Sequence, residues 1–146
     1  MKSASTRLVD CLPGFSLIEL VVAMGIIGIL AAIAIPAYSA YTKTANRTDA
    51  TRTMTYDAQA LERCYSQTFS FLGCTSAPAG SSTSAQGYYT VTIAPTANSF
   101  TITATPLKSP QTRDSACGTF TLNNAGTQGA TTSGGAANTQ QCWGST

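Results

Sequence analysis

The longest apolar stretch of the chain limits what its amino-terminal part can become. Residues 20–35 contain no charged or strongly polar side chain, and the mostly apolar residues 15–18 precede them. Together they supply roughly the 20 residues that a helix needs to cross the hydrocarbon core of a bilayer. One acid, Glu19, lies within this segment. An ionised side chain in hydrocarbon costs about 3 kcal/mol and normally marks a function with a partner, so we predict a membrane-spanning helix whose acid pairs with a cation.

The six residues at the start of this segment resemble a known processing site. They read GFSLIE over residues 14–19, after a short polar leader and before the apolar run, as in the prepilins of the type IV pilin family. The resemblance implies that a membrane peptidase cleaves after Gly14 and methylates the new amino terminus on Phe15. It also implies that Glu19 serves subunit assembly and that Pro36 bends the helix. The alternative is a simple signal-anchor helix with a chance acid at its border.

A charge argument supports the assembly role of Glu19. Cleavage after Gly14 would leave an α-amino group with a pKa near 8 on Phe15, and this group is mostly protonated at neutral pH. The amine and the carboxylate would lie about one helical turn apart, so each subunit would offer both charges to a neighbour. Because a low dielectric strengthens an ion pair and penalises an unpaired charge, we expect the amine of an incoming subunit to neutralise Glu19 and set the register of the stack.

The chain divides into three predicted parts. Residues 1–14 are a leader peptide that is cleaved, residues 15–37 form the transmembrane and filament-core helix, and residues 38–146 form a head outside the cytoplasm. Basic residues outnumber acidic ones in the leader, so the positive-inside rule places the amino end in the cytoplasm. We therefore expect a single-pass protein of the bacterial inner membrane that moves into an extracellular pilus filament on assembly.

The composition argues against catalysis. The 146 residues carry a formal net charge of +2 and include no histidine. Histidine is the commonest general base and metal ligand, and without it no Ser-His or Cys-His nucleophilic pair can form. Asp57 and Glu62 are five positions apart and do not share a helix face, so they are not a catalytic pair. We expect no enzyme, no cofactor and no metal, and the low net charge gives no global basic footprint for nucleic acid.

The head is predicted to combine a helix with a small sheet. Apolar residues recur at three- and four-residue steps over residues 38–65, which indicates an amphipathic helix that continues the apolar segment. Three later segments alternate apolar and polar residues and indicate strands with one apolar face. We therefore expect an α+β fold, with the long amino-terminal helix packed on an antiparallel sheet of three or four strands within residues 88–122. The strand segments are residues 88–93, 100–105 and 118–122.

Two stretches rich in Ser, Thr, Gly and Ala separate or follow these strands. Residues 66–87 and 129–139 are predicted to be loops for this reason. The surrounding sequences YYTVTIAP, FTITATP, CGTFTLNNAGT and the closing CW resemble the carboxyl half of low-abundance, minor-type pilins.

The cysteines become an even set once the leader is removed, because Cys11 precedes the proposed cut. Four cysteines in a head outside the cytoplasm indicate two disulfides, and the residues alone leave three pairings open. The resemblance to pilins, which hold a carboxyl-terminal loop by a disulfide, favours Cys64 with Cys74 and Cys117 with Cys142. The second pair would bound the loop of residues 117–142.

A possible DNA-binding edge is suggested by three residues near the carboxyl end. Lys108 and Arg113 flank a proline-containing loop, and Trp143 adds an aromatic ring. Some minor pilins that resemble this chain bind DNA for uptake. Phosphate contacts need several converging cations, and the cations of the helix, Lys43 among them, are predicted to turn elsewhere. An ordinary solvated loop is the alternative.

The main functional hypothesis is a structural subunit of a type IV pilus, of the minor class. Its partners would be prepilin peptidase and methyltransferase, other pilin subunits, and the inner-membrane assembly machinery that polymerises a helical filament. Such filaments serve adhesion, twitching motility or DNA uptake. Two alternatives are a filament-borne DNA receptor for natural transformation and a pseudopilin of type II secretion. The four head cysteines speak against the pseudopilin, because pseudopilin heads tend to lack two disulfides.

Overall fold

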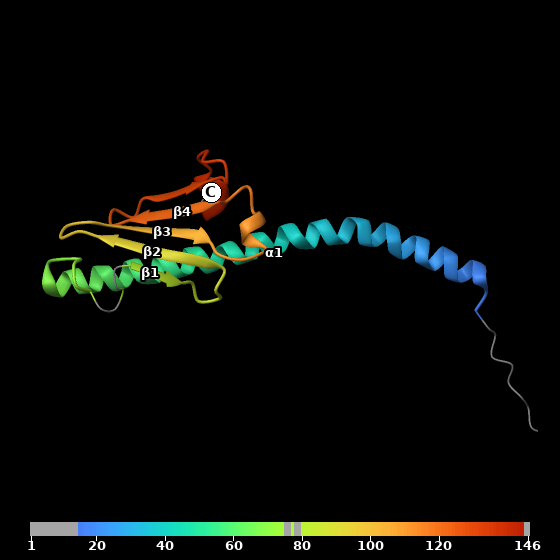
Figure 1. The fold of residues 1–146 in the computed structure, drawn as a ribbon, viewed down its shortest axis with the longest axis horizontal. Coiled ribbons are helices and arrows are strands. Elements are labelled where there is room, and N and C mark those ends of the chain that lie inside the picture. Colours follow the sequence, from blue (N-terminus) through green and yellow to red (C-terminus); the bar gives the residue numbers. More distant parts are fainter. Residues whose placement is uncertain (1–14, 75–76, 78–79, 145–146) are drawn as a thin grey trace, which may run out of the picture. The chain divides into compact units, whose positions relative to one another are not determined.

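The computed structural model describes residues 15–74, 77 and 80–144 (Figure 1). The predicted leader, with Gly14 of the cleavage site, lies outside the described residues. The chain divides into two units, and the division falls between Ala37 and Tyr38. The first unit is an apolar helical segment, and the second is a compact head.

Helix α1 (Leu17–Thr68) begins in the first unit and continues into the head. Its apolar part is long and uncharged enough to cross a membrane, and none of that part is buried in the structure. Exposed apolar surface of this extent requires lipid or neighbouring helices to cover it. Pro36 lies inside α1, where its nitrogen cannot donate a hydrogen bond to the preceding turn. The helix ends three residues later than predicted, next to Phe69, whose φ of 53° is incompatible with a further helical turn.

The head contains one antiparallel sheet of five strands, which follow one another in the order of the sequence (Figure 1). The turn between the last two strands is held by Asn123, whose Oδ1 accepts hydrogen bonds from the backbone nitrogens of Ala125 and Thr127. The strands are β1 (Gly80–Thr83), β2 (Tyr89–Pro95), β3 (Phe100–Pro106), β4 (Thr119–Asn123) and β5 (Gln128–Thr131).

One face of the sheet packs against the part of α1 that lies in the head (Figure 1). Because side chains alternate between the two faces of a strand, every second residue of β2, β3 and β4 points into this core. The burial of each large apolar side chain contributes about 1.5–3 kcal/mol. The α+β fold expected from the sequence is confirmed. The core is formed by Ala50, Met54, Ala60 and Leu61 of α1 and by Tyr89, Val91, Ile93, Phe100, Ile102, Ala104, Phe120, Leu122 and Ala130 of the sheet.

The sheet extends beyond the predicted limits of residues 88–122. The strand β1 lies within one of the segments that the sequence predicts as loops, and β5 overlaps the other. The loop prediction is wrong for both strands. All four residues of β1 are exposed, and Ala130 is the one buried residue of β5, so neither strand shows the alternation of a half-buried strand. Pairing with β2 and β4 makes them strands. At Gly129 a Cβ atom would overlap the Oγ1 atom of Thr121, so this low-complexity glycine is needed for the pairing.

Two disulfides close the head. Cys64 is bonded to Cys74 with a Cα–Cα distance of 5.9 Å, and Cys117 is bonded to Cys142 at 5.7 Å. These are the pairs that the resemblance favours. The second bond ties the short helix α2 (Thr139–Trp143) to the segment before β4, which holds the otherwise irregular carboxyl end on the sheet. Each cross-link stabilises the fold by on the order of 3 kcal/mol through its constraint on the unfolded chain.

Candidate functional site

The residues expected to serve assembly lie at the free end of the apolar segment. Phe15 precedes α1 and is 80% exposed, and Glu19 lies in the first helical turn. The partial positive charge at a helix N-terminus favours an acid at this position. Glu19 is the one charged residue among residues 15–42. No basic side chain among residues 15–42 could therefore pair with Glu19.

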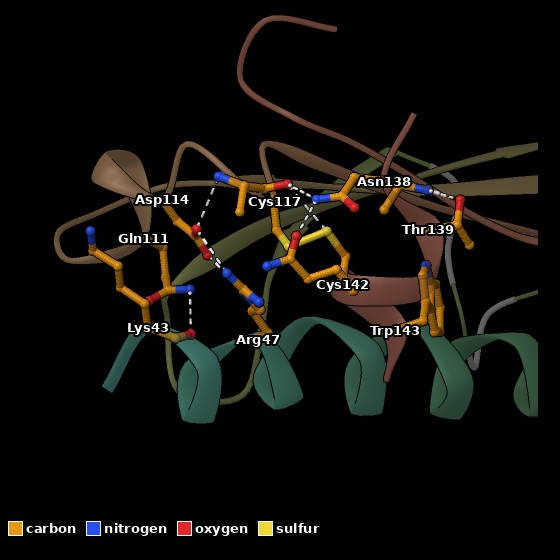
Figure 2. Close-up of a disulfide and its surroundings, with 12 residues drawn as sticks. Lys43, Arg47, Gln111, Asp114, Cys117, Asn138, Thr139, Cys142 and Trp143 are labelled. Carbon is orange, nitrogen blue, oxygen red and sulfur yellow. Dashed lines mark hydrogen bonds and ion pairs between the residues drawn. A yellow bond between two sulfur atoms is a disulfide. The ribbon is translucent and has the colours of Figure 1, made fainter. Parts of the chain in front are cut away.

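The loop after β3 is anchored on α1 by Gln111 (Figure 2). This side chain is fully buried, and its Nε2 donates to the carbonyl oxygen of Lys43 at 3.1 Å and to the hydroxyl of Tyr89 at 2.7 Å. Burial raises the pKa of Tyr89 to about 12, so the phenol stays neutral in this network. The contacts hold the short 3-10 helix η1 (Gln111–Arg113) beside the part of α1 that enters the head.

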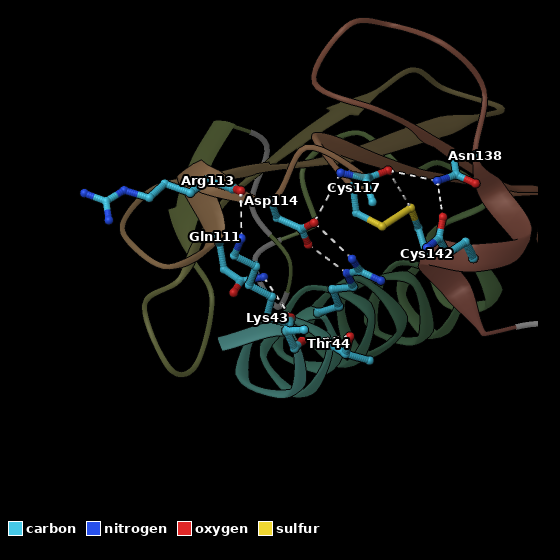
Figure 3. A network of polar contacts seen from close by, with 12 residues as sticks. Lys43, Thr44, Gln111, Arg113, Asp114, Cys117, Asn138 and Cys142 are labelled. Atoms are coloured by element: carbon cyan, nitrogen blue, oxygen red, sulfur yellow. Dashed lines mark hydrogen bonds and ion pairs between the residues drawn. A yellow bond between two sulfur atoms is a disulfide. The ribbon is translucent and has the colours of Figure 1, made fainter. Parts of the chain in front are cut away.

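A buried ion pair fixes the same loop. Arg47 donates from Nε at 2.8 Å and from Nη2 at 2.9 Å to the two carboxylate oxygens of Asp114. Their side chains are only 11% and 3% exposed. Figure 3 shows Asp114 between η1 and the disulfide of Cys117 and Cys142. The bidentate geometry fixes both side chains, and it occupies both carboxylate oxygens of Asp114.

Three cations gather at the end of the head where α1 enters it. The Nζ atom of Lys43 donates to the carbonyl oxygen of Arg113 at 3.0 Å. Lys108 belongs to the same turn, because its carbonyl oxygen accepts from the backbone nitrogen of Gln111 at 3.0 Å. Its Nζ lies 5.1 Å from the centre of the Tyr88 ring, and the side chain of Arg113 points away from the polar network in Figure 3.

These three residues, Lys43, Lys108 and Arg113, are called the basic end below. The buried ion pair is the single salt bridge within the described part of the chain. None of the three cations is therefore neutralised by a carboxylate of the described head. The arrangement brings three positively charged residues from two segments far apart in the sequence to one end of the head. Binding of phosphates requires several cations.

Trp143 lies apart from the basic end, although its place in the sequence groups it with Lys108 and Arg113. Its Nε1 donates to the carbonyl oxygen of Gly129 at 2.8 Å, and its ring meets Phe120 edge to face at 6.0 Å between centroids. Figure 2 shows it on the opposite side of the second disulfide from Lys43. Trp143 is therefore a packing residue of the carboxyl-terminal helix.

Lys43 is the candidate that sequence reasoning places elsewhere and that the structure brings into the basic end. It is 70 residues from Arg113 in the sequence. Local periodicity carries no information about contacts at this separation, because the contact depends on how the loop returns to the helix. In the sequence, the one indication of a role for Lys43 is its position near the start of the amphipathic part of α1.

A hollow of about 560 Å³ lies between α1 and the turn after β4, and Glu62 is its one carboxylate. Asp57 does not line this hollow, and burial raises the pKa of its carboxyl group. Among the described residues no group of three His, Cys, Asp or Glu side chains could hold a metal ion.

Comparison with known proteins gives matches for the apolar segment and for the head. Residues 14–35 match the prokaryotic N-terminal methylation motif. The chain is 51% identical over 51 residues to the prepilin peptidase-dependent protein D of Escherichia coli (strain K12), and the match covers 35% of each chain. The chain thus spans about a third of the length of this curated relative.

The head carries the more extensive match. Residues 36–121 match the family model described as type IV minor pilin ComP, DNA uptake sequence receptor. These residues are more than half of the chain, and they include the basic end, the strands β1 to β3 and the first part of β4. The chain is a type IV minor pilin and belongs to this ComP family.

Proposed function

We propose that this minor pilin serves as a DNA receptor on a type IV pilus and that the basic end contacts the phosphates. The observation that carries the proposal is the match of residues 36–121 to a family whose description includes "DNA uptake sequence receptor". The matched residues include Lys43, Lys108 and Arg113. The family match over the head also favours a pilus subunit over a pseudopilin of type II secretion.

The electrostatics of the basic end support phosphate binding. Residues 38–146 contain six Lys or Arg and four Asp or Glu, so the head has a net charge of +2. Two of the four acids, Asp49 and Asp114, are buried and hydrogen-bonded. The excess positive charge is therefore exposed, and the exposed hydroxyls of Ser109 and Thr112 in the same loop supply further donors for phosphate oxygens.

Assembly would use the other end of the chain. We propose cleavage after Gly14, methylation of Phe15, and insertion as a single-pass inner-membrane protein with a cytoplasmic amino terminus before entry into the filament. The match of residues 14–35 to the N-terminal methylation motif supports this sequence of events. Within the filament, the apolar segments would cover one another, and Glu19 would accept the amine of a neighbouring subunit. Nothing in this sequence of events requires a substrate to be turned over by the pilin itself.

The intact mass of the protein extracted from its native membrane should report this processing. We expect loss of residues 1–14, the gain of one methyl group, and four fewer hydrogens than the reduced chain because of the two disulfides. Reduction before the measurement restores the four hydrogens and serves as the internal control. A mass that still includes the leader would contradict the processing and with it the proposed role of the Phe15 amine.

The basic end should determine the salt dependence of DNA binding. The slope of log K against log salt is negative for DNA binding, and each phosphate contact on duplex DNA contributes about 0.9 to its magnitude. Replacing Lys43, Lys108 and Arg113 by glutamine should therefore reduce that magnitude by about 2.7. The measurement is the fluorescence anisotropy of a labelled duplex titrated with the full chain in neutral detergent micelles. Absence of binding by the unmodified chain at low salt would end the DNA proposal.

A matched control separates the location of the charges from their number. Arg52 and Arg63 are exposed on α1 outside the basic end, and their replacement by glutamine also removes positive charge. We expect this double variant to keep the slope of the unmodified chain. A loss of slope in both variants in proportion to the charges removed would show that net charge, and not the basic end, attracts DNA.

A further inference from the structure

The basic end lies close to the point where the chain leaves the apolar segment. We propose that, before assembly, this end of the head rests on the membrane itself, with Lys43, Lys108 and Arg113 bound to the phosphates of anionic lipids. The inference goes beyond DNA binding and does not depend on it. It concerns the subunit while it waits in the bilayer.

The length of chain between the two features limits their separation. Lys43 follows Ile35, the last residue of the apolar run, by eight positions along α1. Eight residues of α-helix rise about 12 Å, and the polar headgroup layer takes up about 5–7 Å of that on one side of the bilayer. The remaining distance is below the Debye length of about 8 Å at physiological salt. The charge of Lys43 is therefore within electrostatic reach of the lipid phosphates.

The loop that carries the other two cations is held beside Lys43. The hydrogen bond from Lys43 Nζ to the carbonyl oxygen of Arg113 measures 3.0 Å, and Gln111 binds the carbonyl oxygen of Lys43 at 3.1 Å. Lys108 closes the turn that contains Gln111. In Figure 1 the η1 helix of this loop lies at the end of the head where α1 enters it. The loop thus faces the same side as the first residues of the head.

Exposed aromatic and apolar side chains lie near these cations in the sequence. Tyr38 and Tyr41 follow directly after the apolar segment and are each 73% exposed. Leu107, next to Lys108, is 50% exposed. Tyrosine is enriched at membrane–water interfaces because one end of its side chain is apolar and the other is polar. Cations combined with tyrosines and an exposed leucine fit the headgroup layer better than they fit plain solvent.

No exposed acid opposes this contact within the described head. Asp49 and Asp114 are buried. Asp57 and Glu62 follow Lys43 by at least fourteen positions on α1, which corresponds to about 21 Å or more along the helix. Each cation near an anionic surface strengthens binding by about fivefold. Three cations without an opposing acid would therefore bias the head strongly toward the bilayer surface.

DNA and lipid would then compete for the same cations. A subunit in the bilayer would have its basic end occupied by lipid phosphates, and extraction into a filament would free it. The membrane is the partner that the structure favours for the subunit before assembly, because exposed Leu107 and the apolar rings of Tyr38 and Tyr41 suit the headgroup layer.

Amine acylation of the full chain in lipid nanodiscs tests the membrane contact directly. Lys2, Lys43 and Lys108 are the only lysines in the sequence, so mass spectrometry assigns each acylated lysine without ambiguity. We expect Lys108 to react about fivefold more slowly in nanodiscs that contain phosphatidylglycerol than in nanodiscs of phosphatidylcholine alone. High salt should restore the rate, and Arg113→Gln should weaken the protection of Lys108.

A control lysine detects any general effect of the anionic surface on amine reactivity. Arg63→Lys places an amine twenty positions beyond Lys43, about 30 Å along α1, and its rate should be the same in both kinds of nanodisc. Equal rates for Lys108 in both nanodiscs, or equal slowing of Lys108 and of the control lysine, would overturn the proposal. Protection of Lys108 by added duplex DNA, without protection by phosphatidylglycerol, would also overturn it and leave the basic end to DNA alone.

Discussion

Replacing Asp114 by alanine should lower the free energy of unfolding of the head by about 3–5 kcal/mol, the range observed when one partner of a buried ion pair is removed. The variant leaves the guanidinium of Arg47 in a site where only 11% of the side chain reaches solvent. It also removes the acceptor for the backbone nitrogen of Ala116. Denaturant unfolding of the full chain in micelles, followed by the fluorescence of Trp143, the single tryptophan, measures the change.

Two control variants distinguish an unpaired charge from a general disturbance of the loop. Thr112→Ala changes an exposed side chain of the same loop and should shift stability by no more than about 0.5 kcal/mol. The double variant Arg47→Met with Asp114→Leu removes both charges at once and should be far less destabilised than Asp114→Ala. A loss below about 1 kcal/mol in Asp114→Ala would contradict the view that this ion pair holds the loop on α1.

Glu19→Ala should leave a stable, processed, membrane-bound subunit that enters filaments about thirtyfold less often than the unmodified subunit. In the proposed assembly, the variant would leave the amine of the neighbouring subunit without its carboxylate in a site of low dielectric. Truncating one member of a buried charged pair costs about 2–5 kcal/mol, and the lower limit corresponds to this factor. The measurement is the ratio of the subunit in sheared filaments to the subunit left in membranes, determined by quantitative immunoblotting.

Val21→Ala is the matched control, because it truncates an exposed apolar residue two positions away and leaves the charges unchanged. It should reduce incorporation much less than Glu19→Ala. Glu19→Asp keeps the charge on a shorter side chain and should give an intermediate ratio. If Glu19→Ala enters filaments at the normal ratio, the acid has no role in setting the register.

The features that could be predicted from the sequence are those encoded by residues near one another in the chain. The apolar run with Glu19 predicts its helix because length and hydropathy are local properties. The strands β2, β3 and β4 are recognisable because their apolar residues alternate. The disulfides followed from the number of cysteines outside the leader and from the resemblance to pilins. The α+β fold follows from these elements together.

The outer strands were not predictable in the same way. The strand β1 has four exposed residues, and β5 contains a glycine that the pairing with β4 requires. Their own side chains bury almost nothing, so hydrophobic periodicity cannot identify them. Hydrogen bonding to neighbours that are already in place makes them strands.

Long-range polar contacts were also invisible in the sequence. From its position in the sequence, Asp49 is one of several charged residues of an amphipathic helix. In the structure its carboxylate accepts hydrogen bonds from the side chain of Ser84 at 2.5 Å and from the backbone nitrogen of Gln86 at 2.9 Å. It thereby organises the turn between β1 and β2. Arg47 likewise finds its partner 67 residues later in the chain.

The sequence by itself determined that this chain has an apolar helix bearing one acid, followed by a disulfide-bonded α+β head. Only the tertiary structure decided which cations share a surface: it brought Lys43 beside Arg113 and Lys108 and placed Trp143 elsewhere. The physical reason is that helix formation and membrane insertion depend on neighbours within a few turns, whereas the position of a charge depends on where a loop returns to the helix. That return is set by the buried contacts of Gln111 and Asp114, which no local pattern reveals.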